Sequence, residues 1–165
     1  MSITTILKQA GIFRDLTPEQ LELIAAIAQE REYHTGDLLF EENSTSDELY
    51  IIGRGEVDLQ INPALVGEDE VIGPITIATL RRGQSFGEIA LVDQGVRTAS
   101  VRCARYDTCL VIIPRDKLMQ LCEAHPQLGY RLMRNLAVDL AAKLRDTDMR
   151  FREQLFWTLG NLSRS

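Results

Sequence analysis

Hydrophobic positions change their spacing twice along the chain, which separates it into three segments. Residues 17–30, TPEQLELIAAIAQE, place apolar side chains on one face of a helix, namely Leu21, Ile24, Ala25 and Ala28. Thr17 and Gln20 have the spacing of a capping box, and Pro18 suits the first helical position. These features predict an N-terminal helical segment, residues 1–31.

Residues 32–113 have the pattern of a β-sheet region. Short segments such as ELYIIG, EVDLQI, TIATL, ASVRC and CLVIIP are separated by turn residues. Eight of the eleven glycines lie between Gly36 and Gly95. Such close punctuation favours a barrel or jelly roll over crossover units with a parallel sheet.

Residues 114–165 return to helical spacing. PRDKLMQLCEA predicts a short helix, His125-Pro126 breaks it, and a long helix follows with leucines every four residues, at Leu128, Leu132, Leu136, Leu140 and Leu144. This row drifts about 40° per step, so the apolar surface is broad enough to face the sheet alone or also a second copy. Polar residues 145–148 interrupt the apolar pattern of this helix, and a second apolar group follows them near the end of the chain. Whether this second group docks on another surface or is mobile stays open.

Composition narrows the class of protein. With 165 residues, the chain has about the length of one domain, and it contains no apolar run near the ~20 residues of a membrane span. The net charge of −6 argues mildly against general affinity for nucleic acid. Three cysteines without metal-ligand spacing are typical of reduced thiols in a cytoplasmic protein. We find no metal-ligand set and no nucleophile with a partnered base, so we expect neither an enzyme nor a cofactor.

One stretch, SFGEIALVDQGVRTASVRC at residues 85–103, combines groups that fit a nucleotide. Gly83 and Gly87 bracket a turn, and a brief helical turn after it directs backbone N–H groups at one spot, as in anion sites. The planar fork of Arg97 suits a phosphate. Glu88, as a pure acceptor, fits a ligand that carries hydroxyl donors next to that phosphate.

FGEIALVDQGVRTASV resembles the phosphate-binding cassette of the cyclic nucleotide-binding domain family without a gap. The likeness extends through GIFRDLTPEQLELIA and GDLLFEENSTSDELYIIGRGEVDL, and the run RTASVR is shared with hyperpolarisation-activated cyclic-nucleotide-gated channels. The resemblance implies an α+β fold, an eight-stranded jelly-roll β-barrel flanked by N-terminal helices and a long C-terminal helix. Its expected parts are residues 1–31, the jelly roll 32–113 with the cassette 85–100, and the lid or dimerisation helices 114–165.

The resemblance also assigns roles to residues. It implies that Arg97 pairs with the cyclic phosphate, that Glu88 accepts from the ribose 2′-hydroxyl, and that Gly87 and Ala90 supply backbone N–H groups. The rest of the expected ligand-binding set is Phe86, Ile89, Thr98 and Ala99. Because Thr98 stands where members that accept cyclic GMP often carry a hydroxyl, cyclic AMP and cyclic GMP both stay open as the ligand.

The expected function is a cyclic nucleotide-binding regulatory protein. Leu140 or Leu144 would form a lid over the purine, and movement of the C-terminal helix would relay binding to a homodimer or an effector protein. Two alternatives stay open: a ligand-free dimerisation scaffold of the same fold, and the sensor part of a transcription regulator lacking its DNA-binding domain. Only five residues follow Gly160, too few for a helix-turn-helix, so we expect no DNA contact. Because no apolar run approaches the length of a membrane span, we also expect no membrane contact.

Overall fold

The computed structural model describes residues 1–45, 47–62, 73–93, 97 and 99–164. Three short elements come first along the chain, α1 (Ile3–Gln9), the 3₁₀ helix η1 (Gly11–Phe13) and α2 (Pro18–Ala25). The predicted capping box is confirmed: the Thr17 hydroxyl accepts from the Gln20 N–H at 3.2 Å, and the Gln20 side chain accepts from the Thr17 N–H at 2.9 Å. It fixes the start of α2.

The first strand begins before the predicted end of the N-terminal helical segment at residue 31. Strand β1 (Gln29–Tyr33) begins inside the segment that we assigned to helices. Its residues pair antiparallel with β8 (Thr108–Pro114), Gln29 opposite Ile112. The physical reason is that an exposed strand at a sheet edge needs no apolar alternation, so the polar run QERE carried no strand signal.

Two four-stranded antiparallel sheets form the centre of the described fold. Their strand orders are β1-β8-β3-β6 and β2-β7-β4-β5. The other strands are β2 (Leu38–Phe40), β3 (Glu48–Arg54), β4 (Glu56–Ile61), β5 (Ile75–Arg81), β6 (Ser85–Phe86) and β7 (Ser100–Cys103). Antiparallel sheets with helices confirm the α+β class, whereas closure into a jelly-roll barrel stays a prediction.

The first sheet is covered on both faces, which explains the uninterrupted apolar run of β8. Leu110 and Ile112 belong to a buried cluster with Val57 and Val101 of the second sheet. The intervening Cys109, Val111 and Ile113 belong to another cluster, with apolar residues of the helices. Alternate side chains of β8 therefore serve two cores, one between the sheets and one against the helices.

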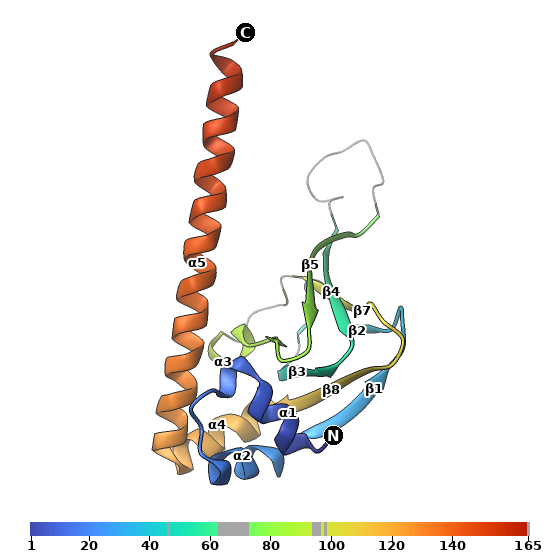
Figure 1. Cartoon of the computed structure of the whole chain (residues 1–165), viewed down its shortest axis with the longest axis vertical. Helices are drawn as coiled ribbons and strands as arrows, with labels where there is room; N and C mark the ends of the chain where they lie inside the picture. The colour runs from blue at the N-terminus through green and yellow to red at the C-terminus, as the bar shows by residue number, and fades with distance from the viewer. Residues whose placement is uncertain (46, 63–72, 94–96, 98, 165) are drawn as a thin grey trace.

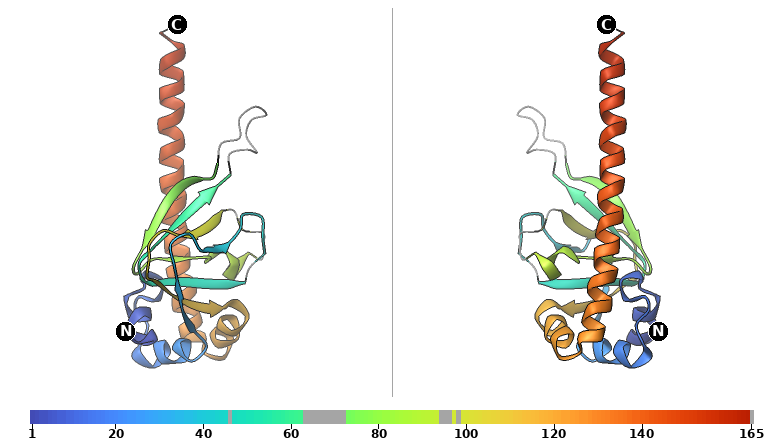
Figure 2. Two further views of the ribbon diagram at one scale, coloured as in Figure 1. Left: turned by 90° about the vertical axis from the view of Figure 1, so that its right-hand side faces the viewer. Right: turned by 90° about the vertical axis from the view of Figure 1, so that its left-hand side faces the viewer.

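The C-terminal part consists of α4 (Arg115–Ala124) and α5 (Pro126–Leu162). Leu128, Leu132 and Leu136 are buried against the helical cluster. From residue 141 to 164 every residue of the chain is exposed, and this half of α5 extends away from the sheets (Figure 1, Figure 2). The helix runs without interruption through residues 145–148, where its apolar pattern has a polar break, because polar side chains are at no disadvantage on an exposed helix.

Within the described residues, no helix has the length and apolar character to cross a membrane. The same part of the chain contains no group of three His, Cys, Asp or Glu residues arranged to hold a metal ion.

Candidate ligand-binding site

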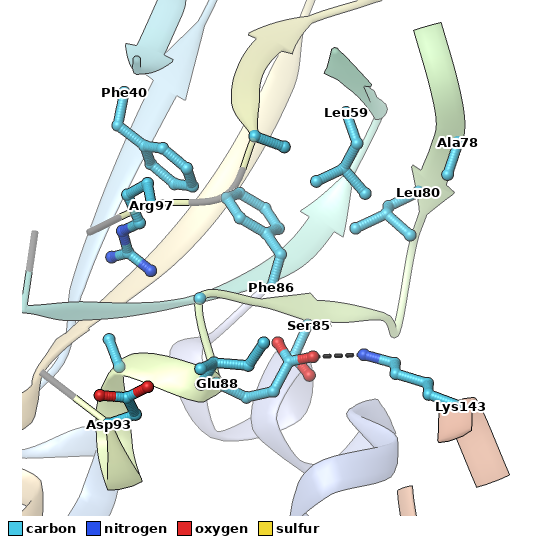
Figure 3. Close-up of a pocket in the computed structure, with 14 residues that line it drawn as sticks. Phe40, Leu59, Ala78, Leu80, Ser85, Phe86, Glu88, Asp93, Arg97 and Lys143 are labelled. Carbon is cyan, nitrogen blue, oxygen red and sulfur yellow. Dashed lines mark hydrogen bonds and ion pairs between the residues drawn. The ribbon is translucent and has the colours of Figure 1, made fainter. Parts of the chain in front are cut away.

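A cavity of about 390 Å³ lies where the second sheet, the cassette and α5 meet. Its volume is within the range of ordinary small-molecule sites. Figure 3 shows the residues that line it: Phe40, Leu59, Ala78, Leu80, Ser85, Phe86, Gly87, Glu88, Ile89, Ala90, Asp93, Arg97, Ala99 and Lys143. Residues from distant parts of the sequence therefore share one pocket.

A glycine turn brings the cassette backbone against Arg97. Gly87 follows β6 with a φ of +81°, a conformation that favours glycine. A Cβ atom at this position would lie 2.7 Å from the Glu48 carbonyl oxygen and 2.9 Å from Nη1 of Arg97. After this turn comes the predicted short helical segment, α3 (Ile89–Val92), in which the Ala90 N–H donates to the Gly87 carbonyl at 3.1 Å.

Arg97 is 7% exposed and is held in place by several contacts. Its Nη2 donates to the Glu48 carbonyl oxygen at 3.0 Å, and its guanidinium carbon lies 4.4 Å from the centre of the Phe40 ring. Its backbone N–H and carbonyl bond to Ser44 and Asn43, each at 2.8 Å. These contacts present a fixed guanidinium at the pocket wall.

Burial changes the electrostatics of this guanidinium without removing its charge. Desolvation lowers the pKa of Arg97 from its ordinary value, while the neighbouring Tyr50, Glu48 and Asp47 act in the opposite direction. Arginine is nevertheless always protonated in proteins near neutral pH. The pocket therefore has a desolvated cation, which interacts more strongly with an anion than a hydrated one does.

Glu88 is the second charged group of the cassette, and it is also 7% exposed. Its Oε1 forms an ion pair with Nζ of Lys143, which reaches the pocket from α5 (Figure 3). Its Oε2 is buried and accepts no hydrogen bond from the residues that the structure describes. A buried acceptor of this kind is costly unless a ligand donor satisfies it.

Most of the remaining pocket wall is apolar, and Ser85 and Asp93 are its other polar residues. Tyr50 and Phe86 stack in parallel with ring centres 4.8 Å apart, and the Phe40 ring centre lies 6.1 Å from that of Phe86. Leu59 of β4 and Leu80 of β5 line the cavity beside Phe86 (Figure 3). The site thus joins a polar end, suited to an anion with hydroxyl donors, to an apolar end suited to a flat base.

Most of the ligand-binding set expected from the sequence meets in this cavity. Its lining includes Phe86, Gly87, Glu88, Ile89, Ala90, Arg97 and Ala99. Thr98 lies outside the described residues. Leu140 packs on the helical core and Leu144 is 64% exposed, so neither is among the lining residues and their role as a lid stays a prediction.

The residues predicted from the sequence include neither the far walls of the cavity nor Lys143. Phe40, Leu59 and Leu80 belong to strands whose pairing partners cannot be read from spacing. Lys143 carried one usable signal, because it is a cation between Leu140 and Leu144 on the helix face that we expected to turn toward the sheet. A charge beside a predicted lid is a reason to seek its partner in the pocket.

Comparison with known proteins agrees with this geometry. The model of the family described as "Cyclic nucleotide-binding domain" matches residues 30–125, more than half of the chain. The chain is 32% identical over 143 residues to the "Cyclic AMP receptor protein" of Thermus thermophilus, covering 87% of this chain and 61% of that protein. It is also 32% identical to a cGMP-dependent protein kinase of Drosophila melanogaster, over 76% of this chain and 13% of the kinase.

Among solved structures, a cyclic nucleotide-binding domain from Methylobacillus flagellatus superposes with a TM-score of 0.74 at 26% identity. The match covers 90% of this chain and 80% of that one. The chain thus spans less than two thirds of the length of the receptor protein and of the kinase. It spans most of the solved domain.

Proposed function

Because the chain belongs to the cyclic nucleotide-binding domain family, we propose that its cavity binds cyclic AMP or cyclic GMP and that the protein is a regulatory sensor without catalytic activity. In this proposal Arg97 pairs with the cyclic phosphate and Glu88 accepts from the ribose 2′-hydroxyl. The purine lies along the apolar wall, and the two sheets are the halves of a jelly-roll barrel. The observation that carries the proposal is the burial of Arg97 and Glu88 in one cavity.

The expected affinity follows from ligand size. A cyclic nucleotide of about 22 heavy atoms, at roughly 0.3 kcal/mol each, gives a binding free energy of ~−7 kcal/mol, hence a Kd on the order of micromolar. Names of relatives support both nucleotides, since one relative is a cyclic AMP receptor and another a cGMP-dependent kinase. Between them the proposal makes no choice.

Calorimetric titration of the nucleotide-free protein with cyclic AMP, cyclic GMP and 5′-AMP tests the proposal. We expect saturable binding of a cyclic form and much weaker binding of 5′-AMP, whose open phosphate has a different shape and charge. If none of the three ligands binds, the proposal is overturned, and a ligand-free scaffold becomes the better account of the fold.

The output of the sensor is proposed to pass through α5, with a second copy of the chain as the partner. Leu144, Phe151, Leu155 and Leu162 are exposed and recur with the a/d spacing of a coiled coil. Phe156 and Trp157 beside them are 80% and 72% exposed. A surface this apolar is typical of an interaction site.

Sedimentation equilibrium of the whole chain tests the dimer. We expect a dimer for the wild type and a monomer for Leu155→Asp, while Gly160→Asp, on the opposite face of the helix from the four apolar positions, serves as the control for added charge. A wild-type monomer at high micromolar concentration would exclude self-association through α5 and favour an effector protein as its partner.

A further inference from the structure

Lys143 connects α5 to the polar end of the cavity. The side chain begins on the exposed half of the helix and is 62% exposed, yet its ammonium group reaches Oε1 of Glu88 (Figure 3). Lysine can place its charge several ångströms from its own backbone because its stem is long and flexible. The contact therefore joins a helix outside the sheets to the carboxylate at the centre of the cassette.

The two oxygens of Glu88 are in different situations. Lys143 occupies Oε1, whereas Oε2 is buried and has no hydrogen-bond partner among the described residues. An ionised carboxylate accepts at both oxygens, so the ammonium group and a ligand hydroxyl do not compete for the same atom. The ion pair restricts the Glu88 side chain and leaves one acceptor for the ligand.

The ion pair also solves an electrostatic problem of the site. A carboxylate buried close to a bound phosphate would repel it, and this repulsion is strong where water is excluded. Arg97 compensates the phosphate, and the Lys143 ammonium compensates Glu88. Loss of Lys143 would release the Glu88 side chain, which would then turn away from the phosphate and no longer be held for a ligand hydroxyl.

We propose that Lys143 is a positioning residue for ribose recognition, which holds Glu88 for the 2′-hydroxyl and thereby links that contact to α5. The inference rests on the proposed function of the cavity and adds to it a residue outside the cassette. Two other roles make opposite predictions. If the ion pair were a lock that the ligand must break, removing it would tighten binding, and if it were an incidental surface pair, removing it would change nothing.

The experiment compares cyclic AMP and its 2′-deoxy analogue by calorimetry on the full chain, or the cyclic GMP pair if that nucleotide binds better. For Lys143→Met we expect about fivefold weaker binding of the ribose form and less than twofold change for the deoxy form, the size typical of one partly exposed ion pair. Lys143→Arg should restore most of the ribose affinity. Lys117→Met, an exposed lysine of α4, is the matched control for loss of one positive charge.

Hydrogen exchange supplies the readout for the link to α5. In the wild type, saturating ribose ligand should slow amide exchange around residues 137–146, and in Lys143→Met this slowing should be lost at equal occupancy. Equal weakening of ribose and deoxy forms, tighter binding, or unchanged binding in Lys143→Met would each overturn the inference while the proposed function stands. A wild-type protein that binds no cyclic nucleotide would overturn both.

Discussion

The guanidinium carbon of Arg97 lies 4.4 Å from the centre of the Phe40 ring, so the cation is stacked on an aromatic face. Together with the 3.0 Å bond to the Glu48 carbonyl, this stacking limits the orientations that the fork can adopt. A group that is already ordered loses less entropy when it binds a phosphate. Phe40, far from the cassette in sequence, thus belongs to its binding apparatus.

Replacing Arg97 by alanine should abolish most binding while the fold survives. Leaving the phosphate unpaired in a buried site costs ~2–5 kcal/mol, which weakens binding about thirtyfold or more. Arg97→Lys should recover little of this loss, because an ammonium group cannot reproduce the planar fork. Calorimetry measures the affinity and a thermal melt verifies the fold; an Arg97→Ala protein that binds like its parent would exclude the proposed role.

Glu88→Ala should discriminate between ligands that differ by one hydroxyl. The variant removes the acceptor for the 2′-hydroxyl, so affinity for the ribose nucleotide should fall, by about 1–3 kcal/mol for a hydrogen bond to a charged group. The 2′-deoxy nucleotide should bind the variant and the wild type almost equally well. Lys143 loses its partner in this variant, but it is exposed enough for water to replace the carboxylate. A loss of equal size with both ligands would contradict the assignment.

Gly87→Ala should damage the site more than backbone strain alone explains. The new methyl group would meet a positive φ and also approach the Glu48 carbonyl and Arg97 to less than 3 Å. Gly36→Ala is the matched control, since its φ is +90° and nothing lies within 4 Å of the added Cβ. Both variants should lose about 1 kcal/mol of stability from the left-handed conformation, and only Gly87→Ala should lose nucleotide affinity. Equal affinities in titrations of the two variants would show that Arg97 tolerates the displacement.

Local chemistry explains which features could be predicted from the sequence. The capping box of Thr17 and Gln20 and the turn at Gly87 each depend on residues within a few positions, so their signals survive in the linear chain. The cassette can be predicted for the same reason: Gly87 and Glu88 are consecutive, and Arg97 follows them in the same short segment. The structure places Gly87, Glu88 and Arg97 in the lining of one cavity.

Features that depend on tertiary packing were missed or misplaced. The first residues of β1 are polar because they lie at an exposed sheet edge. The alternation of apolar and polar residues that identifies a strand is therefore absent. Leu144 continues the apolar row of α5, yet its side chain is exposed, because the described residues of the helix after Leu140 pack on neither buried cluster. Lys143 reaches Glu88 only through the direction that α5 takes across the cavity, which side-chain spacing does not encode.

The thiol of Cys109 should make stability fall at alkaline pH. Burial, and next the neighbouring Glu30, raise its pKa from an ordinary 9.0 to about 11. As pH rises above about 9 the unfolded chain releases this proton first, so the stabilising contribution is complete below pH 9 and is lost as pH approaches 11. At pH 10 the loss is roughly 1 kcal/mol.

Urea unfolding of the wild type and Cys109→Ala at pH 8 and pH 10 isolates this contribution, because other alkaline groups titrate in both proteins. The variant starts from lower stability, since a buried side chain is shortened, but its decline between the two values should be smaller. Parallel declines in the two proteins would refute the assignment to Cys109.

Asn135 anchors the first half of α5 to η1, and its replacement should loosen the helix that carries Lys143. Its Nδ2 donates to the carbonyl oxygens of Ile12 at 3.0 Å and Arg14 at 2.8 Å, and the side chain is fully buried. Asn135→Ala would leave two carbonyl groups without these donors, at a cost of about 2–3 kcal/mol in the free energy of unfolding. Asn161→Ala, on the exposed end of the same helix, should change stability by less than about 0.5 kcal/mol.

Chemical denaturation of the two asparagine variants measures these differences, and nucleotide titration adds a second test. If the anchor sets the position of α5 over the cavity, Asn135→Ala should also weaken the cyclic nucleotide under conditions where the protein is still folded. The reason is that Lys143 would then hold Glu88 less often in the arrangement that binds. Unchanged affinity in a destabilised but folded Asn135→Ala protein would show that the first half of α5 contributes to stability and not to nucleotide binding.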